Sequence, residues 1–91
     1  MAIVVEFFGI PRARAGVERV EVADERFQMP LSEVLLALAK QLPDFAESCL
    51  DGSQLRANFI ASIDGQCFVH GDEAMVSSGQ SVLILSADAG G

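Results

Sequence analysis

A short segment enclosed by two prolines places the strongest limit on how this chain folds. In the stretch MPLSEVLLALAKQLP, aliphatic residues recur at helical spacing and form one apolar stripe, made of Leu31, Val34, Leu35, Leu38 and Leu42. Pro30 suits the first turn of a helix, and Pro43 ends it. The opposite face is polar, with Glu33, Lys40 and Gln41. Because only one side of this helix is apolar, we predict that it packs on a β-sheet.

Two segments that alternate with a period of two precede the helix. In IVVEFF, at residues 3–8, Phe7 falls on one face while Glu6 and Phe8 share the other, and the charge of Glu6 marks that second face as solvated. The second segment, VERVEV at residues 17–22, follows the sequence GIPRARAG, which its glycines and proline mark as a turn-rich loop. The two segments predict a β-hairpin.

The second half of the chain adds two strands after a polar crossover, PDFAESCLDGSQLRAN. NFIASIDGQ alternates over 59–63 and then contains Asp64-Gly65, a strong signal for a tight turn, and SVLIL is the last strand. This order in 91 residues predicts an α+β fold of the β-grasp (ubiquitin-like) type, with a mixed sheet of four to five strands and one main helix. The pattern by itself leaves a ferredoxin-like arrangement open, since that needs only one more helix.

Composition excludes several classes of function. The net charge of −7 repels phosphate backbones and anionic lipid, so we expect neither a nucleic acid nor a membrane as partner. The longest apolar run, VLLALA, is too short to span a bilayer, and no signal-peptide pattern opens the chain, which predicts a soluble, cytoplasmic protein. Cys49 and Cys67 are expected to be buried, and His70, the only histidine, to be an ordinary loop residue. We find no metal-binding or catalytic motif and predict that the chain is not an enzyme.

Four segments resemble, in order and at matching spacing, one known family. VVEFFGIPRARAG is similar to its opening strand and loop, LSEVLLALAKQLP to its helix ending in proline, and ASIDGQ to its turn, where the family usually has Asn in place of Asp64. SSGQSVLILSADAGG is similar to its closing strand, which delivers Gly90-Gly91. The family is that of the MoaD/ThiS ubiquitin-like sulfur carriers, which includes the small subunit of molybdopterin synthase. The chain departs from it at Ser86 and Ala87, where the family often has two prolines, and this predicts a looser tail.

The resemblance implies a function for the last residues. It predicts a β-grasp domain at 1–86 and a tail at 87–91, and it implies that an adenylating enzyme of the ubiquitin-activating type uses ATP to join the Gly91 carboxylate to AMP. A persulfide or sulfide then displaces AMP and leaves a thiocarboxylate, which donates sulfur to a synthase subunit in molybdopterin- or thiamine-type biosynthesis. The chain itself would hold no cofactor. Gly90 and Gly91 lack Cβ atoms, which suits a terminus that threads a narrow channel.

The resemblance also implies a docking surface on the solvated face of the sheet. The family's partner surface matches Phe8, Arg12 and Leu85, and we add Leu83 to it. The sequence does not decide which side chains of the last strand lie on the solvated face, because residues 82 and 84 are as apolar as residues 83 and 85. It also leaves open whether a loop shields Phe8.

Two other functions remain open from the sequence. The chain is either a protein modifier, joined through Gly91 to a lysine of a target by way of the same adenylate, or a plain interaction module whose tail has no chemistry. The first alternative shares the activation step with the sulfur carrier, so the sequence does not separate them.

Overall fold

The computed structural model describes residues 2–23, 25–69 and 74–87, with 67–69 as backbone only. The elements in chain order are β1 (Ala2–Phe7), α1 (Ile10–Ala15), β2 (Arg19–Ala23), β3 (Gln28–Pro30), α2 (Leu31–Gln41), α3 (Pro43–Cys49), β4 (Leu50–Asp51), β5 (Gln54–Leu55), β6 (Phe59–Ile63), β7 (Gln66–Val69), β8 (Met75–Ser77) and β9 (Ser81–Ser86).

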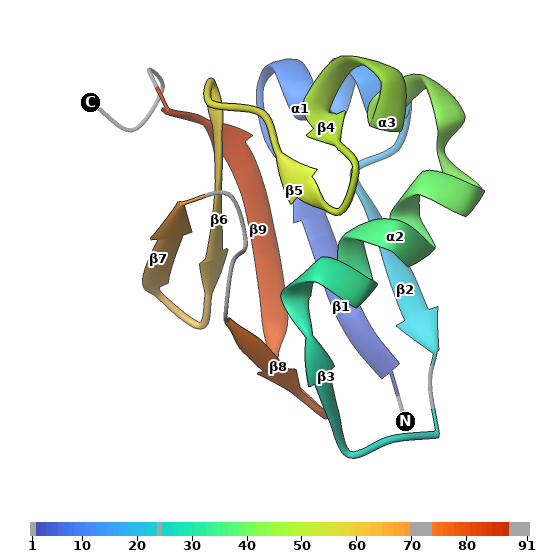
Figure 1. Ribbon diagram of the computed structural model, residues 1–91, viewed down its shortest axis with the longest axis vertical. Coiled ribbons are helices and arrows are strands. Elements are labelled where there is room, and N and C mark those ends of the chain that lie inside the picture. Colours follow the sequence, from blue (N-terminus) through green and yellow to red (C-terminus); the bar gives the residue numbers. More distant parts are fainter. Residues whose placement is uncertain (1, 24, 70–73, 88–91) are drawn as a thin grey trace.

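The main sheet has five strands in the order β2-β1-β9-β6-β7 (Figure 1). The pair of β1 and β9 is parallel, while β1 with β2, β6 with β9, and β6 with β7 are antiparallel. The strands β3 and β8 form a small separate ladder, as do β4 and β5. The first and last strands therefore lie side by side at the centre of a mixed sheet, as the predicted arrangement requires, and the ferredoxin-like alternative is excluded.

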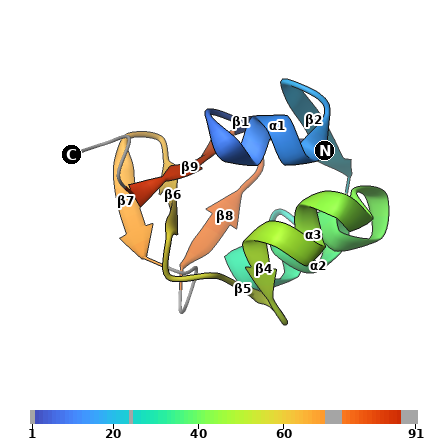
Figure 2. The same cartoon turned by 90° about the horizontal axis from the view of Figure 1, so that it is seen from above.

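The helices cover one face of the sheet, and Figure 2 shows this layer from above. The predicted stripe of α2 is buried against the sheet at Leu31, Val34, Leu35 and Leu38, and Leu42 is half-buried against the same core. The sheet contributes the alternating residues Ile3, Val5 and Phe7 of β1, all fully buried or nearly so. The ring of Phe7 packs edge to face on that of Phe45 in α3, with 5.0 Å between ring centroids.

Two helices lie where the sequence predicted irregular chain. The segment predicted as the loop GIPRARAG contains α1, and the segment predicted as a polar crossover contains α3. The glycines and prolines that indicated turns are the ends of these helices: Gly16 is a left-handed C-cap with φ of 77°, and Pro43 starts α3 directly after α2 ends. No helix in the described ranges is long and apolar enough to cross a membrane.

The predicted tight turn after β6 is present and is tied to β9. Asp64 and Gly65 both have positive φ, of 46° and 91°, as the turn of a two-residue hairpin requires. The Asp64 carboxylate accepts a hydrogen bond from the backbone N–H of Ser81 at 3.1 Å, and the Asp64 N–H donates to the Ser81 carbonyl at 3.2 Å. The turn therefore fixes the start of β9 as well as the hairpin.

Candidate functional site

The face of the sheet opposite the helices carries a row of half-buried apolar side chains. Leu83 of β9 lies across from Glu6 of the parallel strand β1, and Leu85 lies across from Ile60 of β6. Val82 and Ile84 are fully buried in the core. Because side chains alternate along a strand, Leu83 and Leu85 lie on the outer face, which answers the question that the sequence left open.

Phe8 continues this outer surface at the end of β1. Its backbone N–H donates to the carbonyl of Ile84 at 2.9 Å, which holds Phe8 beside the last residues of β9, and Phe8 is 45% exposed. Together with Glu6, Arg12 and other residues it lines a small hollow of about 220 Å³. Within the described chain no loop shields Phe8, so its ring is accessible to a partner.

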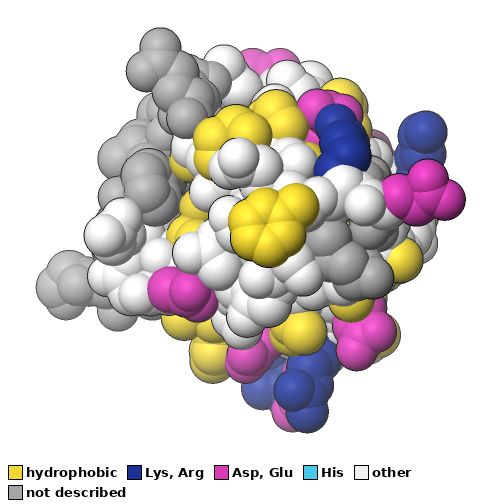
Figure 3. Space-filling view, turned by 90° about the horizontal axis from the view of Figure 1, so that it is seen from below, with side chains coloured by type: hydrophobic (Ala, Val, Ile, Leu, Met, Phe, Trp, Pro, Cys, Tyr) yellow, Lys and Arg dark blue, Asp and Glu magenta, His cyan; other side chains and the backbone are white. Residues whose placement is uncertain are grey.

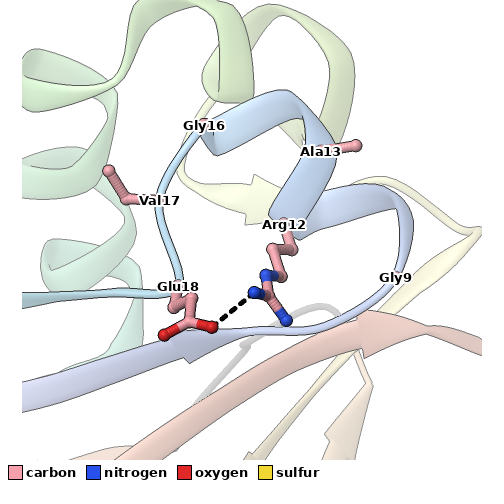
Figure 4. A pocket seen from close by; sticks show the side chains of 6 residues that line it. All are labelled: Gly9, Arg12, Ala13, Gly16, Val17 and Glu18. Atoms are coloured by element: carbon pink, nitrogen blue, oxygen red, sulfur yellow. Dashed lines mark hydrogen bonds and ion pairs between the residues drawn. The ribbon is translucent and has the colours of Figure 1, made fainter.

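Arg12 reaches the same region from α1 and is held by an ion pair. Its guanidinium pairs with the carboxylate of Glu18, which lies just before β2, and both side chains are more than half exposed (Figure 4). The pair lines a shallow pocket of about 410 Å³ at Gly9, Ala13, Gly16 and Val17. An exposed ion pair contributes only about 0–1 kcal/mol, so Arg12 can exchange Glu18 for a partner's carboxylate at little cost.

Arg14 is not part of this surface. It lies two residues after Arg12, about 200° further around α1, and lines a different hollow with Asp44 and Glu47 of α3. The two arginines therefore lie on opposite sides of one short helix.

The point at which the chain leaves the sheet adjoins these residues. β9 ends at Ser86, and the backbone N–H of Ala87 donates to the carbonyl of Asn58 at 2.8 Å. Gly9, at the start of α1, lies against Ser86, because a Cβ placed on Gly9 would be 4.0 Å from the Ser86 hydroxyl oxygen. That hydroxyl is buried and has no hydrogen-bond partner in the described part of the chain. The predicted reactive residues Gly90 and Gly91 lie outside the described residues.

Two apolar residues near the end of the sheet escaped the sequence analysis. Ile10 is 54% exposed at the start of α1, and Ile60 is half-buried next to Leu85 on the outer face. The alternation of β6 contained a signal for Ile60, since it lies between the buried Phe59 and Ala61. Ile10 had no such signal, because its segment was expected to be a loop.

Exposure alone does not single out this surface. Phe27, in the loop between β2 and β3, is 74% exposed, and Figure 1 places this loop at the end of the molecule away from the end of β9. The molecule seen from that end shows hydrophobic and charged side chains interspersed (Figure 3). What distinguishes Phe8 is its place beside the end of β9. The group of Phe8, Arg12, Leu83 and Leu85 is called the exit surface below.

Chemistry-bearing side chains elsewhere are few. Cys49 is fully buried, as predicted, and burial raises the pKa of its thiol although Arg14 and Arg56 act to lower it, so it stays protonated at neutral pH. The side chain of Cys67 and all of His70 lie outside the described residues. Over the ranges that the structure describes, no three His, Cys, Asp or Glu residues lie close enough to hold a metal ion.

The fold has known counterparts, although no protein-family model and no curated protein matches the chain. A crystal structure of SAMP1 from Haloferax volcanii has a TM-score of 0.75 at 18% sequence identity, with 100% of each chain covered. A crystal structure of H. volcanii small archaeal modifier protein 1 has a TM-score of 0.72 at 18% identity, over 92% of this chain and 94% of the other. A Pyrococcus furiosus protein assigned as subunit 1 of molybdopterin converting factor has a TM-score of 0.72 at 17% identity, over 94% and 97%.

The chain has the β-grasp fold. The resemblance to ubiquitin-like proteins of the MoaD type, which the sequence indicated through four short segments, is thereby confirmed for the fold. In this β-grasp domain the parallel pair of β1 and β9 brings Phe8 and the end of β9 to the same edge of the outer face.

Proposed function

We propose that the chain is a ubiquitin-like sulfur carrier, a substrate of other enzymes and not itself a catalyst. The observation that carries the proposal is the position of the exit surface. β9 ends at Ser86, directly after Leu85 and beside Phe8, and in the sequence Gly90 follows four residues later. A partner that binds the exit surface would therefore also lie within reach of the tail. The assignment of one structural neighbour as a molybdopterin converting factor subunit supports a role in cofactor biosynthesis.

The chemistry starts from an unreactive group. The carboxylate of Gly91 is an anion at neutral pH, since an α-carboxyl group has a pKa of about 3.5, and it resists nucleophiles until it is activated. An adenylating enzyme would transfer AMP from ATP to this carboxylate and release pyrophosphate. Sulfide would then form a C–S bond as the C–O bond to AMP breaks. A persulfide would first give an acyl disulfide, which a further thiol reduces to the thiocarboxylate.

The exit surface would serve two partners in turn. The adenylating enzyme and the sulfur-acceptor synthase subunit both need access to Gly91, and each would bind Phe8, Leu83 and Leu85 as an apolar centre with Arg12 at the rim. The net charge of −7 would steer the carrier toward basic docking grooves and speed its association.

The direct test follows the mass of the C-terminus. Incubated with a matching adenylating enzyme, ATP and a sulfur donor, the chain should exchange one oxygen for sulfur at Gly91. Deletion of Gly91 should abolish the exchange, and so should an added residue after Gly91, while the melting temperature should stay unchanged in both variants. Full activity of the deletion variant would contradict the carrier function.

A second candidate function is that of a protein modifier. It is favoured by the neighbour named small archaeal modifier protein 1. The two functions share the adenylate and differ in its acceptor, so chain found in cells on target lysines, and never as a thiocarboxylate, would favour the modifier. A chain without any chemistry at Gly91 would be an interaction module.

A further inference from the structure

The strand β2 forms one border of the main sheet and is paired on one side only. It pairs with β1, and Figure 1 shows it at the border of the sheet opposite β7. The backbone N–H of Phe7 donates to the carbonyl of Glu18 at 2.9 Å, and hydrogen-bonded and non-hydrogen-bonded pairs alternate along an antiparallel ladder. Every second residue of β2 therefore directs its backbone N–H and C=O away from β1, namely Arg19, Glu21 and Ala23.

No described residue outside β1 occupies this edge. The outward backbone groups of Arg19 and Glu21 have no hydrogen-bond partner in the described ranges. The helix α2 leaves the edge open as well, because a hollow of about 410 Å³ lies between it and β2, lined among others by Val22 and Lys40. An uncovered edge of this kind is a template for one further strand.

Arg19 and Glu21 carry opposite charges along this edge. Both are exposed on the outer face, and neither forms an ion pair with a described residue, although Glu6 of β1 lies across from Arg19. When two identical strands pair antiparallel about a two-fold axis at Val20, Arg19 of each copy lies opposite Glu21 of the other. The two residues then share a face and a hydrogen-bonded position of the new ladder, where opposite charges stabilise the pairing. The strand β2 is thus self-complementary in charge.

The other antiparallel registers do not satisfy these charges. Outward-directed residues must lie opposite each other to exchange hydrogen bonds, so the axis can fall only on a residue of the strand. An axis at Arg19 or Glu21 places two like charges directly opposite each other, which is destabilising. An axis at Val22 or Ala23 leaves Arg19 beyond the end of the other copy's β2. The first axis pairs both charges and also sets the exposed Val17 opposite Ala23.

We propose that two copies of the chain pair antiparallel through β2, with the two-fold axis at Val20, so that their sheets join into one continuous sheet. The inference rests on the fold and the charges of β2, and it does not depend on the proposed function. The strand β1 separates β2 from β9, so Leu83 and Leu85 of both copies stay accessible. A single short ladder belongs to the weak, transient interfaces, which bury less than about 1,200 Å², so the dimer is reversible.

Sedimentation equilibrium of the full chain, from about 10 μM to about 1 mM, measures the association. Wild type should show a monomer–dimer equilibrium. Arg19→Glu and Glu21→Arg should each weaken the dimer at least about tenfold, because each variant places two pairs of like charges across the ladder. Glu21→Arg changes the net charge from −7 to −5, which by itself favours association of two acidic copies, so its weaker dimer would identify the local pair. The matched control, Glu47→Arg in α3, changes the net charge equally and should not weaken the dimer.

A mixture of the two charge-reversed chains provides the sharpest comparison. In a mixed pair, the chain with Arg19→Glu and the chain with Glu21→Arg again place opposite charges across from each other. The mixture should therefore associate as strongly as wild type, although neither variant does so alone, and the double variant Arg19→Glu/Glu21→Arg should also dimerise like wild type. Unfolded chains could not regain the pairing, so this rescue controls for folding.

The substitution Val20→Cys checks the position of the axis. The Cα atoms of a non-hydrogen-bonded antiparallel pair lie about 4.5 Å apart, which a disulfide can span. Oxidised glutathione should join position 20 of two copies several-fold faster than it joins two chains with Ala23→Cys, because Ala23 lies opposite Val17. A wild-type chain that stays monomeric would refute the inference and leave the edge to a strand of a different protein. A dimer that neither charge reversal weakens, a mixture without rescue, or equal rates of disulfide formation would overturn the proposed pairing.

Discussion

Replacement of Leu38 by alanine measures how strongly the helix and sheet depend on each other. Leu38 is fully buried in the stripe of α2, so the substitution removes three buried carbon groups, which correspond to about 2.4 kcal/mol of transfer free energy at about 0.8 kcal/mol each. The residual cavity adds to this, and measured Leu→Ala changes in cores lie at about 2–5 kcal/mol. A domain of this length has a total stability of about 5–14 kcal/mol, so the variant should lose a large share of it.

The control for this prediction lies two residues away on the same helix. Leu36→Ala removes the same atoms and has the same helix propensity change, but Leu36 is 46% exposed, so it should lose only about 1.3 kcal/mol of transfer free energy and leave no enclosed cavity. The sequence contains neither Trp nor Tyr, so urea unfolding is best followed by far-ultraviolet circular dichroism. If the two variants had equal unfolding midpoints, the assignment of the α2 stripe to the core would be refuted.

Three further predictions concern the exit surface and the turn before β9. Phe8→Ala should weaken binding of the adenylating enzyme by about 1–3 kcal/mol in calorimetry without loss of stability, whereas Phe27→Ala should leave binding unchanged. Asp64→Ala should lower stability by about 1–2 kcal/mol in urea unfolding, because alanine tolerates the positive φ poorly and offers no carboxylate acceptor, while Asp64→Asn should lose less. Glu18→Gln should change stability by no more than about 0.5 kcal/mol, since its ion pair with Arg12 is exposed, and a larger loss would show that the pair is structural.

The sequence predicted the elements whose hydrophobic period lasts long enough to be recognised. The 11 residues of α2 complete three turns, and the strands β1, β6 and β9 alternate over five or six residues. The helices α1 and α3 have six and seven residues, fewer than two full turns each, and helices so short are not stable by propensity alone. They form because Pro11 and Phe45 are buried, which is a tertiary effect that no local pattern contains.

The exit surface was predictable in composition but not in orientation. SVLIL is apolar on both faces, so period alone did not decide between Leu83 and Val82 for the outer face. The register decides it, because Val5 lies beside Val82 in the parallel ladder and Val5 is in the core. The ion pair of Arg12 with Glu18 was likewise hidden, since it depends on α1 folding back over the start of β2.

Under the proposed function, the geometry of the exit surface imposes a limit on how tightly any partner binds. The adenylating enzyme and the acceptor subunit would both cover Phe8 and Leu85, so they would exclude each other, and the carrier must leave the first before it meets the second. A surface built from half-buried leucines, one exposed phenylalanine and an arginine already paired with Glu18 suits moderate affinity, because part of its apolar area is buried before any partner arrives. The acidic charge then acts on the rate of encounter and leaves the lifetime of the complex short.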